Sequence, residues 1–319
     1  MEESINKRAM ELVDRVAKHS TKLECAILEM DNGCRVIDCG VEVPGSDEAG
    51  RLIAEICLGG LGAVKLSQTH IGKMTLPSVI VSVENPQVAC LASQLAGWAI
   101  RRDDYSAMAS GPARALVRKE KIFEKIPYTD QYEKGAIVLE ASTLPTEDIT
   151  DYISEMCGIE PSNLHCIVVP TASKAGSVQI SARVVEVGVH KMYHLGFDAA
   201  KIKTGYGVAP VAPVFKKDAR AMGVTNDCIM YGGRTYYFIR PSDEDNLETL
   251  AQNLPSSASE QYGVPFYDLF RSHGFNFYGI DSLLFSPAEV TLNDIDSGKS
   301  FKHGKVNPGV LRESLQPSP

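Results

Sequence analysis

The sequence predicts a mixed α/β protein made of two α/β domains. Strand and helix patterns are interleaved along the chain, yet several neighbouring strands are joined by short turns, a mixture that favours mixed sheets over a purely parallel sheet. The 319 residues are enough for two domains of ordinary size. A new strand–helix series begins near residue 150, so we place the domains at residues 1–150 and 151–319, between which the chain can cross more than once.

In the first half, apolar spacing and turn residues predict each element. Apolar side chains recur at helical spacing over residues 4–19, which predicts an amphipathic helix. The apolar runs 23–30 and 34–39 flank Asn32-Gly33, a pair that predicts a hairpin turn with positive φ at both residues. The other elements expected here are a helix over 46–58 ending at Gly59-Gly60, strands over 63–70 and 74–83, a helix from Pro86 to about Arg101, a strand over 136–141 and a helix over 145–157 ending at Gly158.

In the second half, a strand over 165–169 leads into a loop of small residues, 170–177, and then into a long helix, 178–194. Residues 204–214 contain two glycines and two prolines, so we expect a loop there. The remaining expected elements are strands over 228–231 and 235–239, a short helix over 265–272, and a hairpin of strands 289–293 and 300–303 that turns at Ser297-Gly298.

Composition excludes several classes of protein. Hydrophobic residues make up 44% and charged residues 23%, which is typical of a globular chain and excludes a disordered protein, a collagen or a coiled coil. The net charge of −8 comes without a basic face, so we expect no nucleic-acid partner. No run of about 18 apolar residues indicates a membrane span, and the acidic N-terminus lacks the apolar core of a signal peptide. We therefore expect a cytoplasmic protein.

The metal-ligating residues do not form a metal site. None of the eight cysteines forms a Cys-x-x-Cys pair, so we expect them to be reduced and mostly buried. A zinc site at Cys34 and Cys39 would lack two further ligands at usable spacing. His190 and His194 are spaced as in a zinc-binding helix, but Lys191 stands where the zincin motif requires glutamate. We expect no metal.

One charged pair stands on the apolar helix predicted after residue 177. Arg183 and Glu186 lie three residues apart and therefore share a helix face, among neighbours that are mostly apolar. One interpretation is a salt bridge on the helix surface. The other is a catalytic base, a carboxylate held beside a guanidinium in a cleft and ionised near neutral pH.

Two turns of small residues are candidate anion sites. The loop 170–177 precedes a helix, so its N–H groups and the helix N-terminus can bind an anion or oxyanion, although a tight strand–helix turn fits the same residues. A second small-residue turn, 108–115, has Arg114 behind it and carries the same two interpretations. The dense aromatic residues of 262–278 are more typical of a core than of a stacking wall.

Several segments together resemble the methenyltetrahydromethanopterin cyclohydrolase family. They are spread over nearly the whole chain, and the long block at 170–186 is the most specific of them. Lys174, inside that block, stands where we expect an apolar residue in relatives. The matching segments are 36–41, 108–116 (MASGPARAL), 170–186 (PTASKAGSVQISARVVE), 225–227, 262–267 and 290–299.

The resemblance implies an enzyme that reversibly hydrolyses 5,10-methenyltetrahydromethanopterin to 5-formyltetrahydromethanopterin. This reaction belongs to archaeal-type one-carbon metabolism, in methanogenesis or its reversal. The resemblance also implies two α/β domains with a substrate cleft between them, a homotrimer, and no metal or organic cofactor, the pterin being the substrate. The family's catalytic Arg and Glu fall on Arg183 and Glu186.

In this interpretation Glu186 is the general base for water and Arg183 orients it. Contacts to the substrate are expected from Thr171, Ser173, Ser177, Ser110 and Arg114. Two alternatives stay open. One is a nucleophilic amidohydrolase that uses Ser173, Ser177 or Cys166, and the other is a non-catalytic pterin-binding protein.

Overall fold

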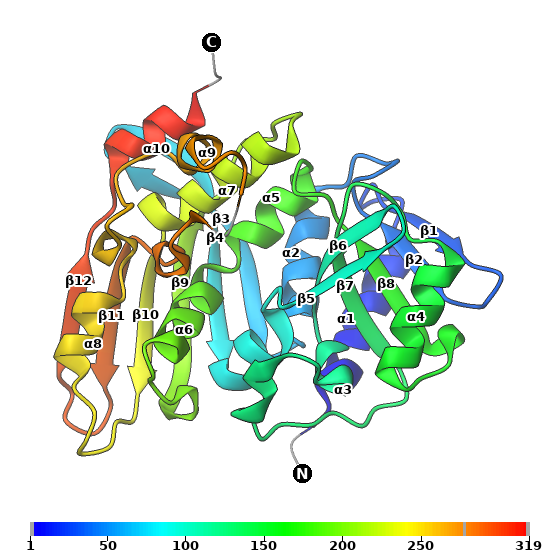
Figure 1. Ribbon diagram of the computed structural model, residues 1–319, viewed down its shortest axis with the longest axis horizontal. Helices are drawn as coiled ribbons and strands as arrows, with labels where there is room; N and C mark the ends of the chain where they lie inside the picture. Colours follow the sequence, from blue (N-terminus) through cyan, green and yellow to red (C-terminus); the bar gives the residue numbers. More distant parts are fainter. Residues whose placement is uncertain (1–2, 277–278, 317–319) are drawn as a thin grey trace. The chain divides into compact units, whose positions relative to one another are not determined.

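The computed structural model describes residues 3–276 and 279–316, and the contacts divide the chain into two units. The first unit runs to Ala63 and resumes over Gln87–Gln179, and the second comprises Val64–Pro86 and the chain from Ile180 onwards. Each unit combines helices with a mixed sheet, so the predicted mixed α/β class is confirmed (Figure 1). The contacts divide the chain after residues 63, 86 and 179. The domain boundary that we expect near residue 150 stays a prediction.

Among the described residues, the first unit contains one six-stranded sheet, which we call sheet A. Its three inner strands β2, β8 and β7 run parallel to one another, and the outer neighbours are antiparallel. The strands in spatial order are β1 (Ala26–Glu29), β2 (Arg35–Asp38), β8 (Leu164–Val168), β7 (Gly135–Glu140), β6 (Tyr105–Ser110) and β5 (Trp98–Arg102).

Both faces of sheet A are buried, because helices cover each side of the sheet. Alternate residues of its central strands therefore point into two different cores. Ile37 and Val138 pack with α1 and α2, whereas Val36 and Leu139 pack with α4. This explains why the inner strands are apolar without alternation. The helices of the unit are α1 (Ile5–Lys18), α2 (Asp47–Cys57), the π-helix Gln87–Gln94, α3 (Arg114–Val117), α4 (Glu147–Cys157) and α5 (Lys174–Ser181), whose last two residues belong to the second unit.

The second unit is built on another six-stranded sheet, sheet B, within the residues that the structure describes. Only β10 and β11 are paired in parallel among the neighbours whose register is known. The strands in spatial order are β12 (Ser300–Gly304), β11 (Glu289–Asp294), β10 (Arg234–Ile239), β9 (Ile202–Pro210), β4 (Met74–Glu84) and β3 (Gly62–Ile71).

Helices α6 and α8 lie across the same face of sheet B (Figure 1), with α6 against β9 and β10 and α8 against β11 and β12. A separate core forms where α7, α9 and α10 meet, around Val224, Phe266 and Leu311. Phe266 and Phe270 belong to that core, as expected for the aromatic segment; Phe277 and Tyr278 lie outside the described residues. The helices are α6 (Val184–His194), α7 (Asp218–Gly232), α8 (Leu247–Asn253), α9 (Phe266–Ser272) and α10 (Pro308–Leu315).

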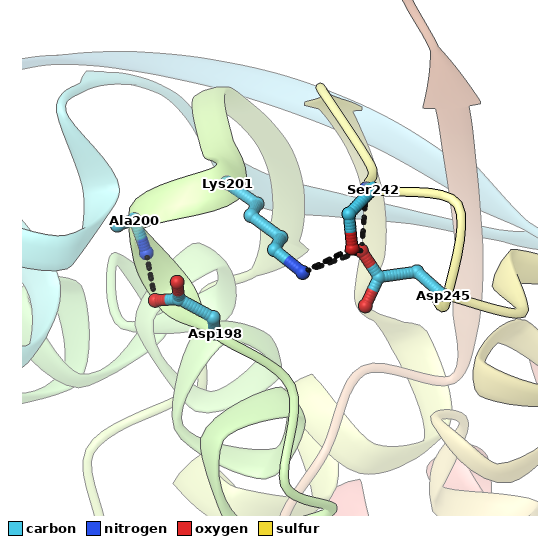
Figure 2. Close-up of polar contacts among 5 residues, drawn as sticks. All are labelled: Asp198, Ala200, Lys201, Ser242 and Asp245. Carbon is cyan, nitrogen blue, oxygen red and sulfur yellow. Dashed lines mark hydrogen bonds and ion pairs between the residues drawn. The ribbon is translucent and has the colours of Figure 1, made fainter.

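A polar network fixes the beginning of β9 to the turn after β10 (Figure 2). The ammonium of Lys201 donates hydrogen bonds to the hydroxyl of Ser242 at 2.8 Å and to the Asp245 carboxylate at 2.6 Å, while Asp198 caps the preceding turn by accepting from the N–H of Ala200 at 3.0 Å. Burial acts to raise the pKa of Asp245, but the hydrogen bonds from Lys201 and Ser242 outweigh it and lower that pKa. The network holds the strand on which α6 rests.

Most predicted elements are confirmed, and four local predictions are wrong. The helix expected over 86–101 ends at Gln94, and Trp98 to Arg102 form a strand in which Trp98 and Ile100 are buried while Ala99 between them is exposed. The run 228–231 lies inside helix α7, where all four side chains are buried and therefore show no helical period. The predicted hairpin at Asn32-Gly33 is confirmed, but only Gly33 has positive φ, while Asn32 donates to Asp151.

The other two corrections concern the surroundings of the charged pair. Residues 204–214 are not a loop, since β9 runs through Gly205 and Gly207 to Pro210. The glycines serve packing, because a Cβ at Gly207 would lie 2.6 Å from Cγ1 of Val184 on α6. The helix expected over 178–194 begins at Lys174 and is interrupted at Ala182 and Arg183, which gives two helices, α5 and α6.

Candidate active site

Arg183 and Glu186 lie at the beginning of helix α6. Arg183 is the residue just before the helix, and its carbonyl oxygen accepts the first helical hydrogen bond from the N–H of Val187 at 2.9 Å. Glu186 stands in the first turn, where the helix dipole favours a negative charge. The helix break at Arg183 was not predicted. Because of it, Arg183 is the cap of α6 and Glu186 lies in its first turn, whereas the sequence predicted both residues within one helix.

The pair is buried, which excludes the interpretation of a solvated salt bridge on the helix surface. The side chains of Arg183 and Glu186 are 9% and 4% exposed, and Nη1 lies 3.9 Å from Oε2. At this distance the two groups form an ion pair. The distance exceeds the roughly 2.8 Å of a charge-assisted hydrogen bond, so this contact lacks the geometry of a tight arginine–carboxylate fork. Desolvating two charges is costly, so a buried ion pair is weak evidence for a purely stabilising role.

Sheet B holds the first turn of α6 rigidly. The Tyr237 hydroxyl donates a hydrogen bond of 2.8 Å to the carbonyl oxygen of Val185, which lies between the two charged residues. Val185 also packs on Gly205 of β9, where a Cβ would lie 2.7 Å from its Cγ1. Glu186 and Arg183 are therefore positioned by a strand–helix contact and not by a loop, as precise sites require.

Within the first unit, the carboxyl ends of three parallel strands lie at one edge of sheet A, the place where ligands bind in open α/β sheets. Asp38 ends β2, and its carboxylate accepts from the N–H groups of Gly40, Val41 and Glu42 at 2.9, 2.7 and 2.8 Å. At the ends of β8 and β7, the Thr171 hydroxyl donates to the Glu140 carboxylate. Glu140 was not predicted as a site residue, although a carboxylate directly after the buried run of β7 was the available signal in the sequence.

The loop 170–177 is shorter than predicted, because α5 begins within it. The Ser173 hydroxyl donates to the carbonyl oxygen of Pro170 at 2.7 Å and accepts from the N–H of Gly176 at 2.9 Å, so it caps α5. Gly176 leaves no room for a side chain, since a Cβ there would lie 2.0 Å from that same carbonyl oxygen. Thr171, Ser173 and Ser177 are all buried, and the turn is a tight strand–helix connection with its helix N-terminus at the carboxyl end of β8.

Ser110 and Arg114 are engaged within the first unit. Arg114 is fully buried; its Nε donates to Glu120 at 2.7 Å and its Nη1 to the carbonyl oxygens of Leu91 and Ser93 at 3.1 and 3.0 Å. The Ser110 hydroxyl lies 3.5 Å from the thiol of Cys57. The charge of Arg114 thus has a structural use in holding the turn after β6, and its contact to a substrate stays a prediction.

The cysteine thiols and histidine imidazoles are further candidates for a nucleophile or for metal ligands. All eight cysteines are buried and free, as predicted. A hydrogen bond with Cys34, and then burial, raise the pKa of the Cys166 thiol, which disfavours Cys166 as a nucleophile. The Nε2 atoms of His190 and His194 are 3.0 Å apart. Over residues 3–276 and 279–316, no three His, Cys, Asp or Glu side chains are grouped to hold a metal, and no helix there is long and apolar enough to cross a membrane.

A buried carboxylate at a helix start, beside a guanidinium and on a strand–helix contact of an α/β protein, is a candidate general base. Comparison with known proteins identifies the family. The family model described as Cyclohydrolase (MCH) matches residues 4–315, and the chain belongs to this family. The resemblance noted in the sequence is thereby confirmed.

Individual relatives agree along their whole length. Proteins named methenyltetrahydromethanopterin cyclohydrolase from Methanocaldococcus jannaschii and Methanococcoides burtonii are 45% and 43% identical over 316 and 315 residues, covering 98% of this chain and 98% of each relative. The protein of that name from Methanothermobacter marburgensis is 45% identical over 316 residues, which cover 98% of this chain and 99% of the relative.

Proposed function

We propose that the protein reversibly hydrolyses 5,10-methenyltetrahydromethanopterin to 5-formyltetrahydromethanopterin. Relatives that match the chain from end to end carry the name of this activity. The structural observation that carries the proposal is the buried pair of Arg183 and Glu186 at the start of α6. Because the pair is desolvated and rigidly held, it has the properties that general-base catalysis requires.

The chemistry needs a base and a positioned water. The methenyl carbon lies between two nitrogens of a cationic amidinium and is already electrophilic. In the proposed reaction Glu186 accepts a proton from a water molecule as the water oxygen attacks that carbon. The bond from this carbon to one of the two nitrogens then breaks and that nitrogen takes up one proton of the water. The formyl group stays on the other nitrogen, and the second proton of the water is released.

Arg183 has a positioning role in this proposal. Its guanidinium lies 3.9 Å from Glu186, close enough to orient the carboxylate and to donate to the attacking water or to the oxygen that becomes the formyl group. No covalent intermediate on the protein is needed. The burial of Cys166 and the use of the Ser173 hydroxyl as a helix cap favour this mechanism over that of a nucleophilic amidohydrolase.

Substrate contacts are proposed at the carboxyl end of sheet A. Thr171 and Ser173 stand where ligands commonly bind in α/β sheets, which supports their role, and Ser177, Ser110 and Arg114 follow from the family resemblance. The same resemblance implies that the substrate binds in a cleft between two domains, which is part of the proposal. We further propose a cytoplasmic homotrimer that acts in methanogenesis or its reversal without a metal or organic cofactor.

The direct test is a spectroscopic assay. The purified protein is incubated with methenyltetrahydromethanopterin, and the near-ultraviolet absorbance of the methenyl form is followed with and without EDTA. We expect the absorbance to fall at the same rate in both samples. No change at any pH would overturn the proposed activity, and binding of the pterin without turnover would favour the non-catalytic alternative. Loss of activity in EDTA that zinc restores would overturn the metal-free mechanism and point to His190 and His194.

A further inference from the structure

Helix α6 carries three proton-binding groups in a row. Glu186, His190 and His194 follow one another at a spacing of four residues. Residues four apart are neighbours on a helix surface, with Cβ atoms about 5–6 Å apart. Helix side chains lean toward the N-terminus, so each histidine leans toward the group before it. Val185 and Gly188, which pack on sheet B, belong to a different stripe of the helix.

The two histidines are hydrogen-bonded to each other. Their Nε2 atoms are 3.0 Å apart, so one imidazole donates and the other accepts, according to the tautomer of each ring. The rings meet edge to face with centroids 4.4 Å apart, and the ring of Tyr193 lies edge-on to His194 at 5.7 Å. An imidazole that takes up a proton at one nitrogen can release a proton from the other. The pair is therefore able to pass a proton from ring to ring.

Exposure to solvent increases along the row. The side chain of Glu186 is 4% exposed, His190 is half-buried and His194 is exposed. From Glu186 to His194 the helix rises about 12 Å, at about 1.5 Å per residue. Lys191 on the same helix is not part of the row, because it is buried and its ammonium donates to the carbonyl oxygen of Pro255 at 3.0 Å. The row thus leads from a buried carboxylate to the surface at the last turn of the helix.

The proposed reaction releases one proton in every turnover. Of the two protons of the water, one ends on the nitrogen that is freed and the other leaves the enzyme. Glu186, as the general base, must be a carboxylate again before it can accept a proton from the next water. Because its side chain is buried, proton exchange with bulk water at Glu186 itself is restricted. A route from Glu186 to the surface therefore speeds the recovery of the base.

Resting on the proposed function, we propose that His190 and His194 relay the proton from Glu186 to solvent during hydrolysis, and back to Glu186 in the reverse reaction. The O–H bond of the protonated Glu186 breaks as an N–H bond forms at Nδ1 of His190. The proton on Nε2 of His190 then passes to Nε2 of His194, and the proton on Nδ1 of His194 passes to water. One proton enters the row and one leaves it, and no group is oxidised or reduced. Both rings end neutral in the other tautomer, until ring rotation restores the first.

The acidities of the groups fit this direction. A carboxylic acid is ordinarily a stronger acid than an imidazolium ion, so a proton on a carboxyl passes readily to a neutral imidazole. Burial lowers the pKa of His194 below its ordinary value, so its ring is mostly neutral at pH 7 and gives a transferred proton readily to water. Because the histidines act through Glu186, the relay predicts an effect on kcat and little effect on KM.

The test is the absorbance assay at constant pH and ionic strength, with the concentration of added imidazole varied and EDTA present throughout. The variants are His194→Ala and His190→Gln. His194 is exposed and alanine favours a helix, so the fold should persist, which far-ultraviolet circular dichroism verifies. His303→Gln is the matched control, because it removes a histidine that pairs with Glu248 and lies on β12 of the same unit.

We expect kcat of the unmutated chain and of His303→Gln to be nearly independent of imidazole. Both relay variants should lose kcat several-fold at low imidazole with KM unchanged, and added imidazole should restore kcat in His194→Ala, because the free base replaces the missing ring. The solvent deuterium isotope effect on kcat should be larger in both variants than in the unmutated chain.

Two outcomes would overturn the relay while leaving the proposed activity intact. One is a kcat of both variants that equals that of the unmutated chain at every imidazole concentration. The other is a loss of kcat in His194→Ala that imidazole does not restore, which would mean that the ring only supports the end of α6. No turnover by the unmutated chain would overturn the proposed activity and the relay together.

Discussion

The hydroxyl of Tyr237 donates a hydrogen bond of 2.8 Å to the main-chain oxygen of Val185. Val185 lies between Arg183 and Glu186, so a single side chain of β10 is tied to the turn that bears both charged groups. Gly188, one turn further along α6, has no side chain because a Cβ there would lie 2.0 Å from the Tyr237 oxygen. The hydrogen bond and the close approach at Gly188 thus fix the distance between α6 and β10.

Tyr237→Phe should lower turnover without removing it. The ring keeps its packing, but the lost hydrogen bond costs about 1 kcal/mol of stability and loosens the first turn of α6. We expect kcat to fall several-fold with little change in KM, together with a small decrease in melting temperature. Tyr236→Phe is the control, because it removes the neighbouring hydroxyl on the opposite face of the same strand. Equal effects of the two substitutions on kcat would contradict the positioning role of Tyr237.

Gly207→Ala should destabilise the second unit. Its Cβ would meet Val184 at 2.6 Å and Val185 at 2.9 Å, so α6 must move away from β9. Overpacking of this kind costs about 1–3 kcal/mol, and we expect both the melting temperature and kcat to fall. Gly309→Ala in α10 is the control, since its nearest atom is a side-chain oxygen at 3.4 Å and alanine favours a helix. A Gly207→Ala variant as active and stable as the control would show that α6 is free to shift.

Regular spacing made much of the fold predictable, and tertiary packing explains the rest. Helix α1 and the β1–β2 hairpin follow from local periodicity and turn residues, and both were predicted. Strand β9 was not, since Gly205 and Gly207 look like loop residues until α6 is placed on them. The apolar run 228–231 has no period because α7 is buried on all sides there.

The candidate site, like the fold, was predicted only in part. Arg183 and Glu186 stand out because a charged pair interrupts an apolar helix, a feature visible in the sequence alone. The contact of Glu140 with Thr171 joins the ends of two strands, and nothing local to either residue indicates it. Likewise Arg114 looked available for an anion, because its partner Glu120 follows beyond the short helix α3.

Asp227→Asn should change how stability depends on pH. Asp227 is fully buried; burial raises the pKa of its carboxyl to about 7, although hydrogen bonds from Ser314 and Phe266 oppose the rise. A carboxyl whose pKa is higher in the folded state binds more protons there, so its contribution to stability is present below about pH 4 and is lost as pH rises toward 7. The loss amounts to up to about 4 kcal/mol at 1.36 kcal/mol per pKa unit.

Asparagine can accept the same hydrogen bond from Phe266 but does not titrate. We therefore expect the variant to be at least as stable as the unmutated protein at pH 8, and to lose the decline between pH 4 and 7. Melting temperature measured across that range on both proteins tests this, with the difference between the curves isolating Asp227 from all other groups. Parallel curves would mean that the carboxyl titrates normally in the folded protein.

Arg183→Lys should be poorly tolerated. Lysine keeps the positive charge but lacks the planar fork that can donate to a carboxylate and to a water at once. We expect a large fall in kcat with a modest change in KM in the absorbance assay. Arg312→Lys, on the exposed side of α10, is the control and should be silent. Near-normal turnover of Arg183→Lys would show that only the positive charge at this position matters and not the planar guanidinium.

Glu186→Gln separates catalysis from structure most sharply. Glutamine has nearly the same size and can still hold a water, but it cannot accept the proton of that water. Loss of a general base lowers kcat by roughly 10²–10⁴-fold, or about 3–5 kcal/mol of transition-state stabilisation. Because the substrate is cationic, KM should also rise when the negative charge is removed.

Stability must be measured on the same variant, because Glu186 and Arg183 form a buried pair. If the pair only holds the fold, removing one charge leaves the other unpaired and should cost about 3–5 kcal/mol of stability with kcat unchanged in the folded fraction. If Glu186 is the base, kcat collapses even at temperatures where circular dichroism shows the variant fully folded. Glu248→Gln, which removes an exposed carboxylate paired with His303 on the same unit, should alter neither quantity appreciably. If Glu186→Gln has the same kcat as the unmutated protein, Glu186 is not the general base, and the base implied by the family resemblance is not at this position.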